Sequence, residues 1–359
     1  MMKFRRVPSA RGKLPRIMGS TARNQLRVGV VGCGFWARFQ IQAWSEVEGV
    51  RVTGLNSLRR SDAEAALSLA PGAEVYDRVV ELAAQVDLVD IIASVPAHRP
   101  LVETLLPLGV PVVCQKPLGA TIDECESMTK LAKETGTWLA VHENWRYQAP
   151  FRAIKDVLEA GEIGAVHRAR LTFSCSFDVF LNQPALATAE RFIVSDVGCH
   201  VLDTVRYLFG EAAELFALNS RVNPAIAGED VSTILLRMES GAHVTVELSY
   251  ASPLEDESFP ATYLLVEGKS GSLRLGPNND LSVYVDGVIR QETILAPVYD
   301  WVDPRYALVQ SSIVACHRDL VRALGAGESA ATSAADNLRT MRLVEAAYLS
   351  AASGLAIAI

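Results

Sequence analysis

The sequence predicts an α/β protein in two parts, a doubly wound parallel sheet followed by an α+β domain with an open, mainly antiparallel sheet. From Leu26 onward, short and continuously apolar runs alternate with amphipathic stretches. After Gly164, strands that alternate polar and apolar residues replace them. The length of 359 residues also suits two domains. We place a basic arm at 1–24, the first domain at 25–147 and the second at 148–359.

The elements of the first domain follow from hydrophobic periodicity. Continuously apolar strands are buried on both faces by helices, which is typical of parallel sheets with right-handed crossovers. The expected strands are the runs at 26–32, 50–55, 87–94, 110–116 and 138–145. The expected helices run from the first strand to about Glu48, and then over 61–70, 101–109, 122–136 and 151–161.

The second domain is expected to be rich in β-strands, followed by two helices. Turn sequences such as Glu239-Ser240-Gly241 separate the strands. Apolar residues on the open face between 230 and 294 predict a homodimer or homotetramer formed by sheet contacts. The expected strands lie at 167–177, 232–239, 242–250, 262–268, 271–276 and 281–287, and the helices at about 304–324 and 334–353.

Composition excludes several classes of function. The chain has 34 basic and 41 acidic residues, and seven of the basic ones lie in the arm, so nucleic-acid binding is not expected. No apolar run is long enough to cross a membrane. Six cysteines without a CxxC pair suggest a reduced, cytoplasmic protein. The six histidines lack ligand-like spacing, so we expect no metal site.

A glycine-rich turn between the first strand and its helix predicts dinucleotide binding. Residues 32–37 read GCGFWA and fit the pattern GxGxxA. Gly32 and Gly34 would let the backbone approach a pyrophosphate, which the amino terminus of the helix holds with its free amides. Phe35 and Trp36 complete the turn. A glycine-rich turn without a ligand is the alternative, but the strand–turn–helix context favours a Rossmann dinucleotide site.

The end of the second strand bears on the choice of dinucleotide. An NAD-binding protein usually has an acidic residue there for the ribose hydroxyls, but this chain has Asn56. Ser57, Arg59 and Arg60 follow and suit a 2′-phosphate. The pattern therefore favours NADP(H). The alternative is that both arginines point to solvent and NAD(H) is used.

Several motifs together resemble the Gfo/Idh/MocA oxidoreductase family, from about Leu26 to the end of the chain. This resemblance implies a Rossmann domain, a second domain with an open sheet, and NAD(P)-dependent oxidation or reduction of sugars, cyclitols or related polyols. The motifs are GCGFWA at 32–37, QKP at 115–117, HENWRY at 142–147, EAGEIG at 159–164, DVGCHVLDTVRYLFGE at 196–211 and the closing DNLRTMRLVEAAYLSA.

The resemblance also assigns site residues. Lys116 matches the family lysine beside nicotinamide and substrate, where a cation can stabilise a developing alkoxide. Asp196 and His200 match a DxxxH pair and share one helix face. We expect His200 to exchange the hydroxyl proton, Lys116 to polarise the oxygen and Asp196 to hold the substrate. The remaining expected contacts are Ser94, Pro96, His98, Gln115, Pro117 and Asn144 to cofactor, and Arg146 to substrate.

One departure from the family pattern concerns Gln115, which stands where the family has glutamate. Its neutral side chain removes a charge that would favour the ammonium form of Lys116, which would tune the lysine pKa toward neutrality or alter the chemistry. Asp203 either orients the ring of His200 or pairs with Arg206, and we favour the structural role.

The function expected from these residues is hydride transfer between nicotinamide and a carbinol carbon. Two alternatives remain, an NAD-dependent glycoside hydrolase of the same fold and a non-enzymatic sensor of dinucleotide and sugar. Retention of Lys116, Asp196 and His200 together argues against the sensor. The determinants of the substrate are expected in the loop 176–192 and on the second sheet.

Overall fold

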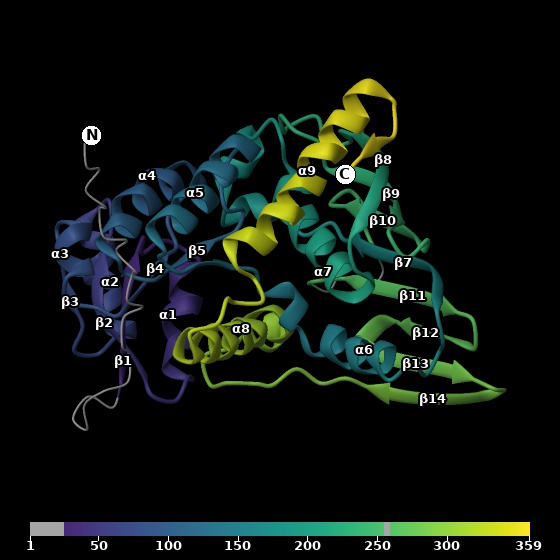
Figure 1. The fold of residues 1–359 in the computed structure, drawn as a ribbon, viewed down its shortest axis with the longest axis horizontal. Coiled ribbons are helices and arrows are strands. Elements are labelled where there is room, and N and C mark those ends of the chain that lie inside the picture. The colour runs from purple at the N-terminus through teal and green to yellow at the C-terminus, as the bar shows by residue number, and fades with distance from the viewer. Residues whose placement is uncertain (1–24, 255–258) are drawn as a thin grey trace, which may run out of the picture.

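The computed structural model describes residues 25–254 and 259–359, so the expected basic arm lies outside the described residues. Two sheets organise this part of the chain, one of six strands and one of nine. Figure 1 shows them next to each other, with helices on both sides of the first sheet. The expected fold class is confirmed.

The first sheet is wholly parallel, with the strand order β3-β2-β1-β4-β5-β6. Every residue of β4, β5 and β6 is buried, as their continuously apolar sequences predict. Chain order reverses between β1 and β4, and ligands of such sheets bind beyond the carboxyl ends of the strands at this point. The strands are β1 (Leu26–Val31), β2 (Val50–Asn56), β3 (Glu74–Val75), β4 (Leu88–Ile91), β5 (Val112–Gln115) and β6 (Leu139–His142).

Helices cover both faces of this sheet. The helix α5 begins at Thr121, whose hydroxyl accepts a hydrogen bond from the amide of Glu124, and ends at Gly136 with φ 66°. On the other face, Leu320 of α8 shares a core with Trp44 of α1, so a late helix packs on the first domain. These helices are α1 (Ala37–Ser45), α2 (Arg60–Ala66), α3 (Val79–Ala83), α4 (Val95–Leu105), α5 (Ile122–Thr135) and α8 (Ala307–Ala326).

The second sheet is mixed but mainly antiparallel, in the order β14-β13-β12-β11-β7-β10-β9-β8-β15. Among the described strands of this second sheet, only β7 and β10 pair in parallel. The strands are β7 (Val166–Ser174), β8 (Ala212–Ser220), β9 (Val231–Met238), β10 (His243–Ser249), β11 (Thr262–Gly268), β12 (Gly271–Leu275), β13 (Asp280–Val285), β14 (Val288–Thr293) and β15 (Ile357–Ala358).

Three helices, α6 (Ala149–Glu159), α7 (Cys199–Phe209) and α9 (Ala334–Ser353), complete the second domain. The helix α9 contacts both α5 and β8, and Figure 1 shows it running from one domain to the other. The helix α9 thus contacts both domains, which the chain also connects covalently after β6. The two expected closing helices are confirmed to within three residues.

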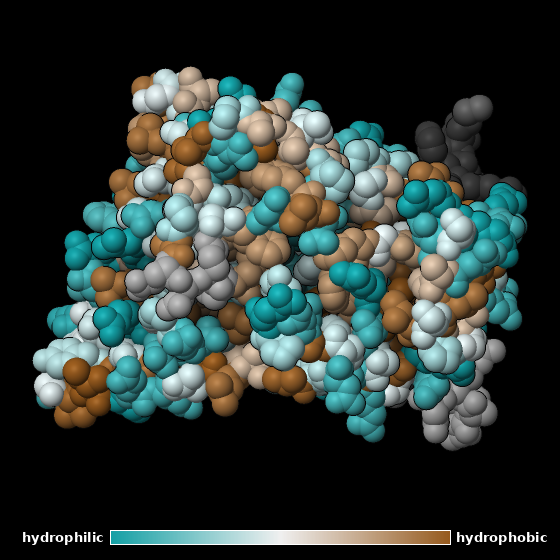
Figure 2. Space-filling model, turned by 180° about the vertical axis from the view of Figure 1, so that it is seen from behind, coloured by the Kyte–Doolittle hydropathy of each residue, from teal (hydrophilic) through white to brown (hydrophobic). Residues whose placement is uncertain are grey.

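One face of the molecule shows how apolar residues are distributed on the surface. Seen from behind, apolar residues occur in small groups between polar ones (Figure 2). In β9, Ile234 and Leu236 are buried whereas Leu235 between them is 50% exposed, as expected for a sheet with one open face. No helix in the described part of the chain is long and apolar enough to span a membrane.

Candidate active site

A cleft of about 950 Å³ lies beyond the carboxyl ends of the first-sheet strands, against α7 and the loop 176–192. Its volume is at the upper end of the range of about 300–1,000 Å³ that is usual for small-molecule sites. Most of the residues expected from the sequence line this one cleft. They are Gly34, Phe35, Trp36, Ser94, Pro96, Gln115, Lys116, Pro117, Asn144, Asp196 and His200.

The glycine-rich turn fits a dinucleotide. Gly32 has φ +94°, and a Cβ there would lie 2.6 Å from the backbone nitrogen of Ala93, so a side chain is excluded. A Cβ on Gly34 would meet no atom within 4 Å and would point into open space. No side chain caps the amino terminus of α1, and its first turn contains no acidic residue. Free amides in that position can hold a pyrophosphate.

The residues at the end of β2 lie outside the cleft lining. Asn56 donates its side-chain amide to the carbonyl of Tyr76, and the hydroxyl of Ser57 accepts from the amide of Cys33. Arg59 pairs with Asp62 at 2.9 Å, and Arg60 pairs with Glu64 and Asp77. Both guanidinium groups therefore already have carboxylate partners. They are also largely solvent-exposed.

His98 has a different environment from the one expected. It is fully buried in α4, and its ring contacts the carbonyl of Ala93 at 3.0 Å and that of Pro117 at 3.0 Å. The ring thus fixes the loops after β4 and β5 relative to each other. His98 supports the cleft from behind and does not line it.

Lys116 follows β5 and points across the cleft to the second domain. Its Nζ donates to Oδ1 of Asp196 at 2.9 Å and to the backbone carbonyl of the same residue at 2.8 Å. Burial lowers the pKa of Lys116, but the charge of Asp196 and the hydrogen bond to it outweigh this, and the pKa is raised. The expectation of a lysine tuned toward neutrality is therefore wrong, because Asp196 supplies the missing carboxylate.

Gln115 belongs to a buried chain of polar groups, which accounts for an amide at this position. Its Oε1 accepts from the backbone amide of Lys116, and its Nε2 donates to Oε1 of Gln40 at 2.5 Å. Gln40 in turn donates to Asp90, as does the indole of Trp44. Burial raises the pKa of Asp90 to about 7. A glutamate at 115 would need a proton to bond Gln40 in the same way.

Asp196 and His200 occupy neighbouring turns at the start of α7. Asp196 lies in a one-turn π-helix, Val194–Gly198, and His200 in the first turn of the α-helix that follows. The Nδ1 of His200 lies 2.5 Å from a carboxylate oxygen of Glu143. Its ring stacks on Trp145 with centroids 4.9 Å apart. Neither Glu143 nor Trp145 was predicted as a site residue from the sequence, although both lie within the ENWR segment.

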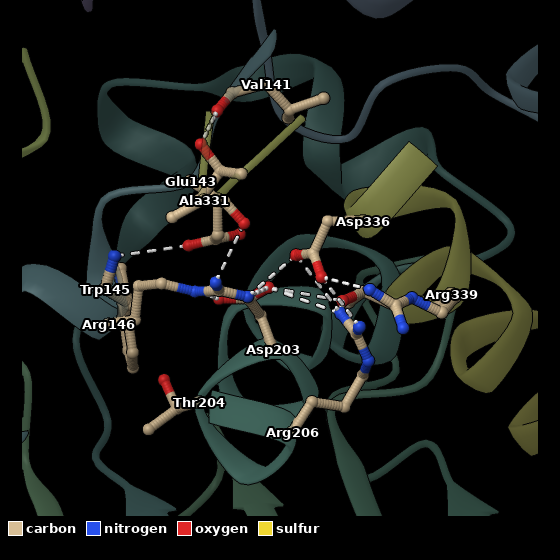
Figure 3. A network of polar contacts seen from close by, with 12 residues as sticks. Val141, Glu143, Trp145, Arg146, Asp203, Thr204, Arg206, Ala331, Asp336 and Arg339 are labelled. Carbon is tan, nitrogen blue, oxygen red and sulfur yellow. Dashed lines mark hydrogen bonds and ion pairs between the residues drawn. The ribbon is translucent and has the colours of Figure 1, made fainter. Parts of the chain in front are cut away.

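Arg146 is not brought into the cleft. Its guanidinium donates to both oxygens of Asp203, at 2.7 and 2.6 Å, and to Asp336 at 3.0 Å. Arg206 lies 3.9 Å from Asp203 and pairs with Asp336 at 2.9 Å (Figure 3). Asp203 thus pairs chiefly with Arg146, and this network joins the end of β6 to α7 and α9.

Aromatic side chains that were not individually predicted from the sequence also line the cleft. Phe177, Phe259 and Tyr306 form a wall of aromatic rings with centroids 5.0 to 6.2 Å apart. Tyr250 stacks on Phe192 at 5.4 Å. These residues come from segments that are distant in sequence, so no local spacing marks them. The loop 176–192 lines the cleft as expected.

Glu143, Cys199 and His200 present ligand atoms within 4.8 Å of one another. The thiol of Cys199 donates to the carbonyl of Asp196, and burial raises its pKa. The charge of Lys116 also acts on all three residues, because it shifts the pKa of each. A protonated thiol and a neighbouring ammonium group suit proton transfer better than the binding of a cation.

A Rossmann cleft with a glycine-rich turn and a lysine, an aspartate and a histidine at one end defines a nicotinamide-dependent oxidoreductase. Residues 26–143 match an oxidoreductase family with an NAD-binding Rossmann fold, and 151–274 match the GFO/IDH/MocA C-terminal domain. The chain belongs to the GFO/IDH/MocA family. It is an oxidoreductase that transfers hydride between nicotinamide dinucleotide and a CH–OH group.

Relatives and solved structures agree with this assignment. A D-apiose dehydrogenase of Paraburkholderia graminis is 40% identical over 93% of this chain and 90% of its own. A second D-apiose dehydrogenase, from Rhizobium rhizogenes, is 37% identical over 93% of this chain and 98% of its own. An oxidoreductase from Agrobacterium radiobacter, solved in complex with NAD+, L-tartaric acid and magnesium, is 37% identical with a TM-score of 0.91 over 93% of this chain and 98% of its own.

Proposed function

We propose that this protein oxidises a small sugar, D-apiose or a close analogue, with NAD+. The observation that carries the proposal is the contact of 2.9 Å between Lys116 and Asp196, with His200 lining the same end of the cleft. A cation, an acceptor and an imidazole meet there at the carboxyl end of a Rossmann strand. The identity of the sugar comes from the two D-apiose dehydrogenases, which each align with 93% of the chain.

Each of the three residues has a distinct role in this proposal. Bound nicotinamide dinucleotide supplies the hydride acceptor. Lys116 donates a hydrogen bond to the substrate oxygen and stabilises negative charge that develops on it. His200 accepts the hydroxyl proton at Nε2, because Nδ1 already contacts Glu143. Asp196 binds a substrate hydroxyl and keeps the Lys116 ammonium directed into the cleft.

The cofactor would occupy the cleft from the glycine-rich turn to Lys116. Gly32, Gly34, Phe35 and Trp36 are proposed to hold the pyrophosphate. The loops after β4, β5 and β6 would surround the nicotinamide end. Their proposed contact residues are Ser94, Pro96, Gln115, Pro117 and Asn144, with His98 acting from behind.

We propose NAD(H) as the preferred dinucleotide, which departs from the sequence-based preference for NADP(H). Arg59 and Arg60 are paired with Asp62, Glu64 and Asp77, and a 2′-phosphate would have to compete with these carboxylates. The additional negative charges would also repel a phosphate. NAD+ in the structure of the Agrobacterium relative supports the same choice.

The open face of the second sheet supports assembly into a homodimer or homotetramer. Leu218 and Leu235 on this face are 59% and 50% exposed. Leu235 pairs across the strands with Phe216, so apolar side chains adjoin on the uncovered side. Contiguous apolar residues on an open sheet are typical of an interface. We also propose a cytoplasmic location, since the six cysteines of the sequence contain no CxxC pair.

A substrate screen tests the proposed function. Purified protein is mixed with NAD+ and with D-apiose, other pentoses, myo-inositol or L-tartrate, and the absorbance of reduced nicotinamide is followed. We expect the highest kcat/KM with D-apiose. Binding without any reduction would favour a sensor, and release of an aglycone without net reduction would favour the hydrolase. Either result would contradict the proposal.

A further inference from the structure

Glu143 is a buried carboxylate behind the cleft that none of the proposed steps uses. It follows β6 and is 0% exposed. Its Oε1 accepts a hydrogen bond from the amide of Trp145 at 3.2 Å (Figure 3) and lies 2.5 Å from Nδ1 of His200. Its Oε2 is buried without a hydrogen-bond partner among the described residues. A carboxylate is costly to bury, so its retention there calls for a role.

The ring of His200 is held in a single orientation by two contacts. Glu143 fixes the edge that carries Nδ1, and Trp145 stacks on the face with an interplanar angle of 7°. Burial raises the pKa of Glu143 to about 7. Above that pH its carboxylate only accepts hydrogen bonds, so the neutral imidazole must donate from Nδ1. The lone pair then lies on Nε2. His200 lines the cleft, so this nitrogen is the one available to a substrate hydroxyl.

The charge of Glu143 matters once His200 has taken up a proton. An imidazolium beside Lys116 would be two cations in a buried site, and burial together with Lys116 lowers the pKa of His200. Above a pH of about 7, Glu143 places a negative charge in direct contact with the ring. The other titratable groups around the pair are Asp196, Cys199, Asp203, His142, Arg146 and Cys316.

We propose that Glu143 is a positioning residue that fixes the Nδ1–H tautomer of His200 and balances the charge of its protonated form. This inference rests on the proposed function. In the oxidation, the O–H bond of the substrate breaks and its proton moves to Nε2 of His200. The electron pair of that bond forms the carbonyl as hydride leaves the carbon for the dinucleotide. Glu143 contacts neither substrate nor cofactor.

Kinetics of Glu143→Gln test the proposal. The amide keeps the shape but removes the charge, and losses of about 10- to 100-fold are usual for a residue that orients a functional histidine. We expect kcat with D-apiose to fall by that factor while KM and the Kd of NAD+ change little. Without the carboxylate, His200 protonates at lower pH, so the acid limb of the kcat profile moves to lower pH. Glu126→Gln, an exposed control, should change none of these.

A double-mutant cycle separates positioning from a general structural role. In a His200→Ala background, Glu143→Gln should cause no further loss, because the group it acts through is gone. An equal loss in both backgrounds would overturn the proposal. So would a kcat within about twofold of the wild type and an unmoved acid limb.

The tautomer of His200 gives a readout that needs no substrate. In nitrogen-15 NMR of histidine-labelled wild-type protein, the resonance lost in His200→Asn should report Nδ1–H. In the Glu143→Gln variant, we expect a second population in which His200 carries its proton on Nε2. A wild-type Nε2–H tautomer would overturn the inference even if the variant fails to fold. Absence of turnover with every sugar, together with the Nδ1–H tautomer, would contradict the proposed function alone.

Discussion

Lys116 and Asp196 are 80 residues apart in sequence, and their side chains meet at 2.9 Å across the cleft. The lysine directly follows β5 of the Rossmann sheet, and the aspartate lies in the π-helix that precedes α7. Their contact therefore exists only when the two domains are assembled. It also keeps the lysine cationic, as a group that stabilises an alkoxide should be.

Lys116→Ala tests the role of that cation. We expect kcat to fall by about 10² or more, because the developing charge on the substrate oxygen loses its stabilising partner. The Kd of NAD+ should change by less than about threefold. Lys130→Ala removes an exposed lysine of α5 and should leave turnover unchanged. Near-normal turnover in Lys116→Ala would remove this residue from the mechanism.

Arg146→Met tests whether this arginine is structural. The change leaves Asp203 buried without its main partner, which typically costs about 3–5 kcal/mol of unfolding free energy in urea denaturation. The exposed Arg342 is a matched control, and its replacement by Met should cost less than about 1 kcal/mol. If Arg146→Met instead raises the KM for the sugar at unchanged stability, then Arg146 binds substrate.

Asp90→Asn tests the buried polar chain beneath Gln115. The pKa of Asp90 is raised from 3.8 to about 7 by burial, so the folded protein binds a proton that the unfolded chain releases between these values. The stability contributed by Asp90 is therefore present below about pH 4 and is lost as pH rises to about 7. The stability of Asp90→Asn relative to wild type should increase between pH 5 and pH 8. A pH-independent difference would refute this assignment.

The choice of dinucleotide can be decided by binding. We expect wild-type protein to bind NAD+ more tightly than NADP+, since both arginines after β2 are paired with carboxylates. The double variant Arg59→Ala, Arg60→Ala should keep the Kd of NAD+ within about threefold. If NADP+ binds more tightly and the double variant weakens it by about one to two decades, the sequence-based preference is correct.

Leu235→Arg tests the assembly through the open sheet face. A charge next to Phe216 on that face should shift light scattering from an oligomer to the 38.9 kDa monomer. Leu108 is a matched control, being 54% exposed on the first domain against 50% for Leu235. Its replacement by Arg should leave the oligomer intact. A monomeric wild type at micromolar concentration would contradict the proposed interface.

Regular patterns in the sequence predicted most of the fold. Continuous apolar runs identified five of the six strands of the parallel sheet, and alternation identified β7 and β9 to β13. The strand β3 was missed because it is only two residues long. The strand β8 was missed because AAELFALNS alternates poorly, and β14 was missed because all six of its residues are exposed. No local sequence pattern predicts the parallel pairing of β7 with β10, because the two strands are distant in sequence.

Site residues that belong to a sequence motif could be predicted, whereas those defined only by contacts in the folded chain could not. Lys116, Asp196 and His200 were found by resemblance, and the structure brings them to one cleft. The partnership of Glu143 with His200 joins residues 57 positions apart, and Arg146 finds Asp336 at a separation of 190. No sequence spacing predicts either pair, so only the folded structure shows which charged side chains are paired.

Transfer of deuterium from the substrate to the dinucleotide tests whether this protein moves hydride. The substrate is D-apiose that carries deuterium on the carbon whose hydroxyl group is oxidised. The wild-type protein turns it over with NAD+, and the reduced dinucleotide is recovered for NMR and mass spectrometry. The account predicts one deuterium at nicotinamide C4 for each sugar oxidised, with the rate of transfer lowered in Lys116→Ala. Deuterium released to water, or sugar converted without labelled dinucleotide, would contradict hydride transfer at this site.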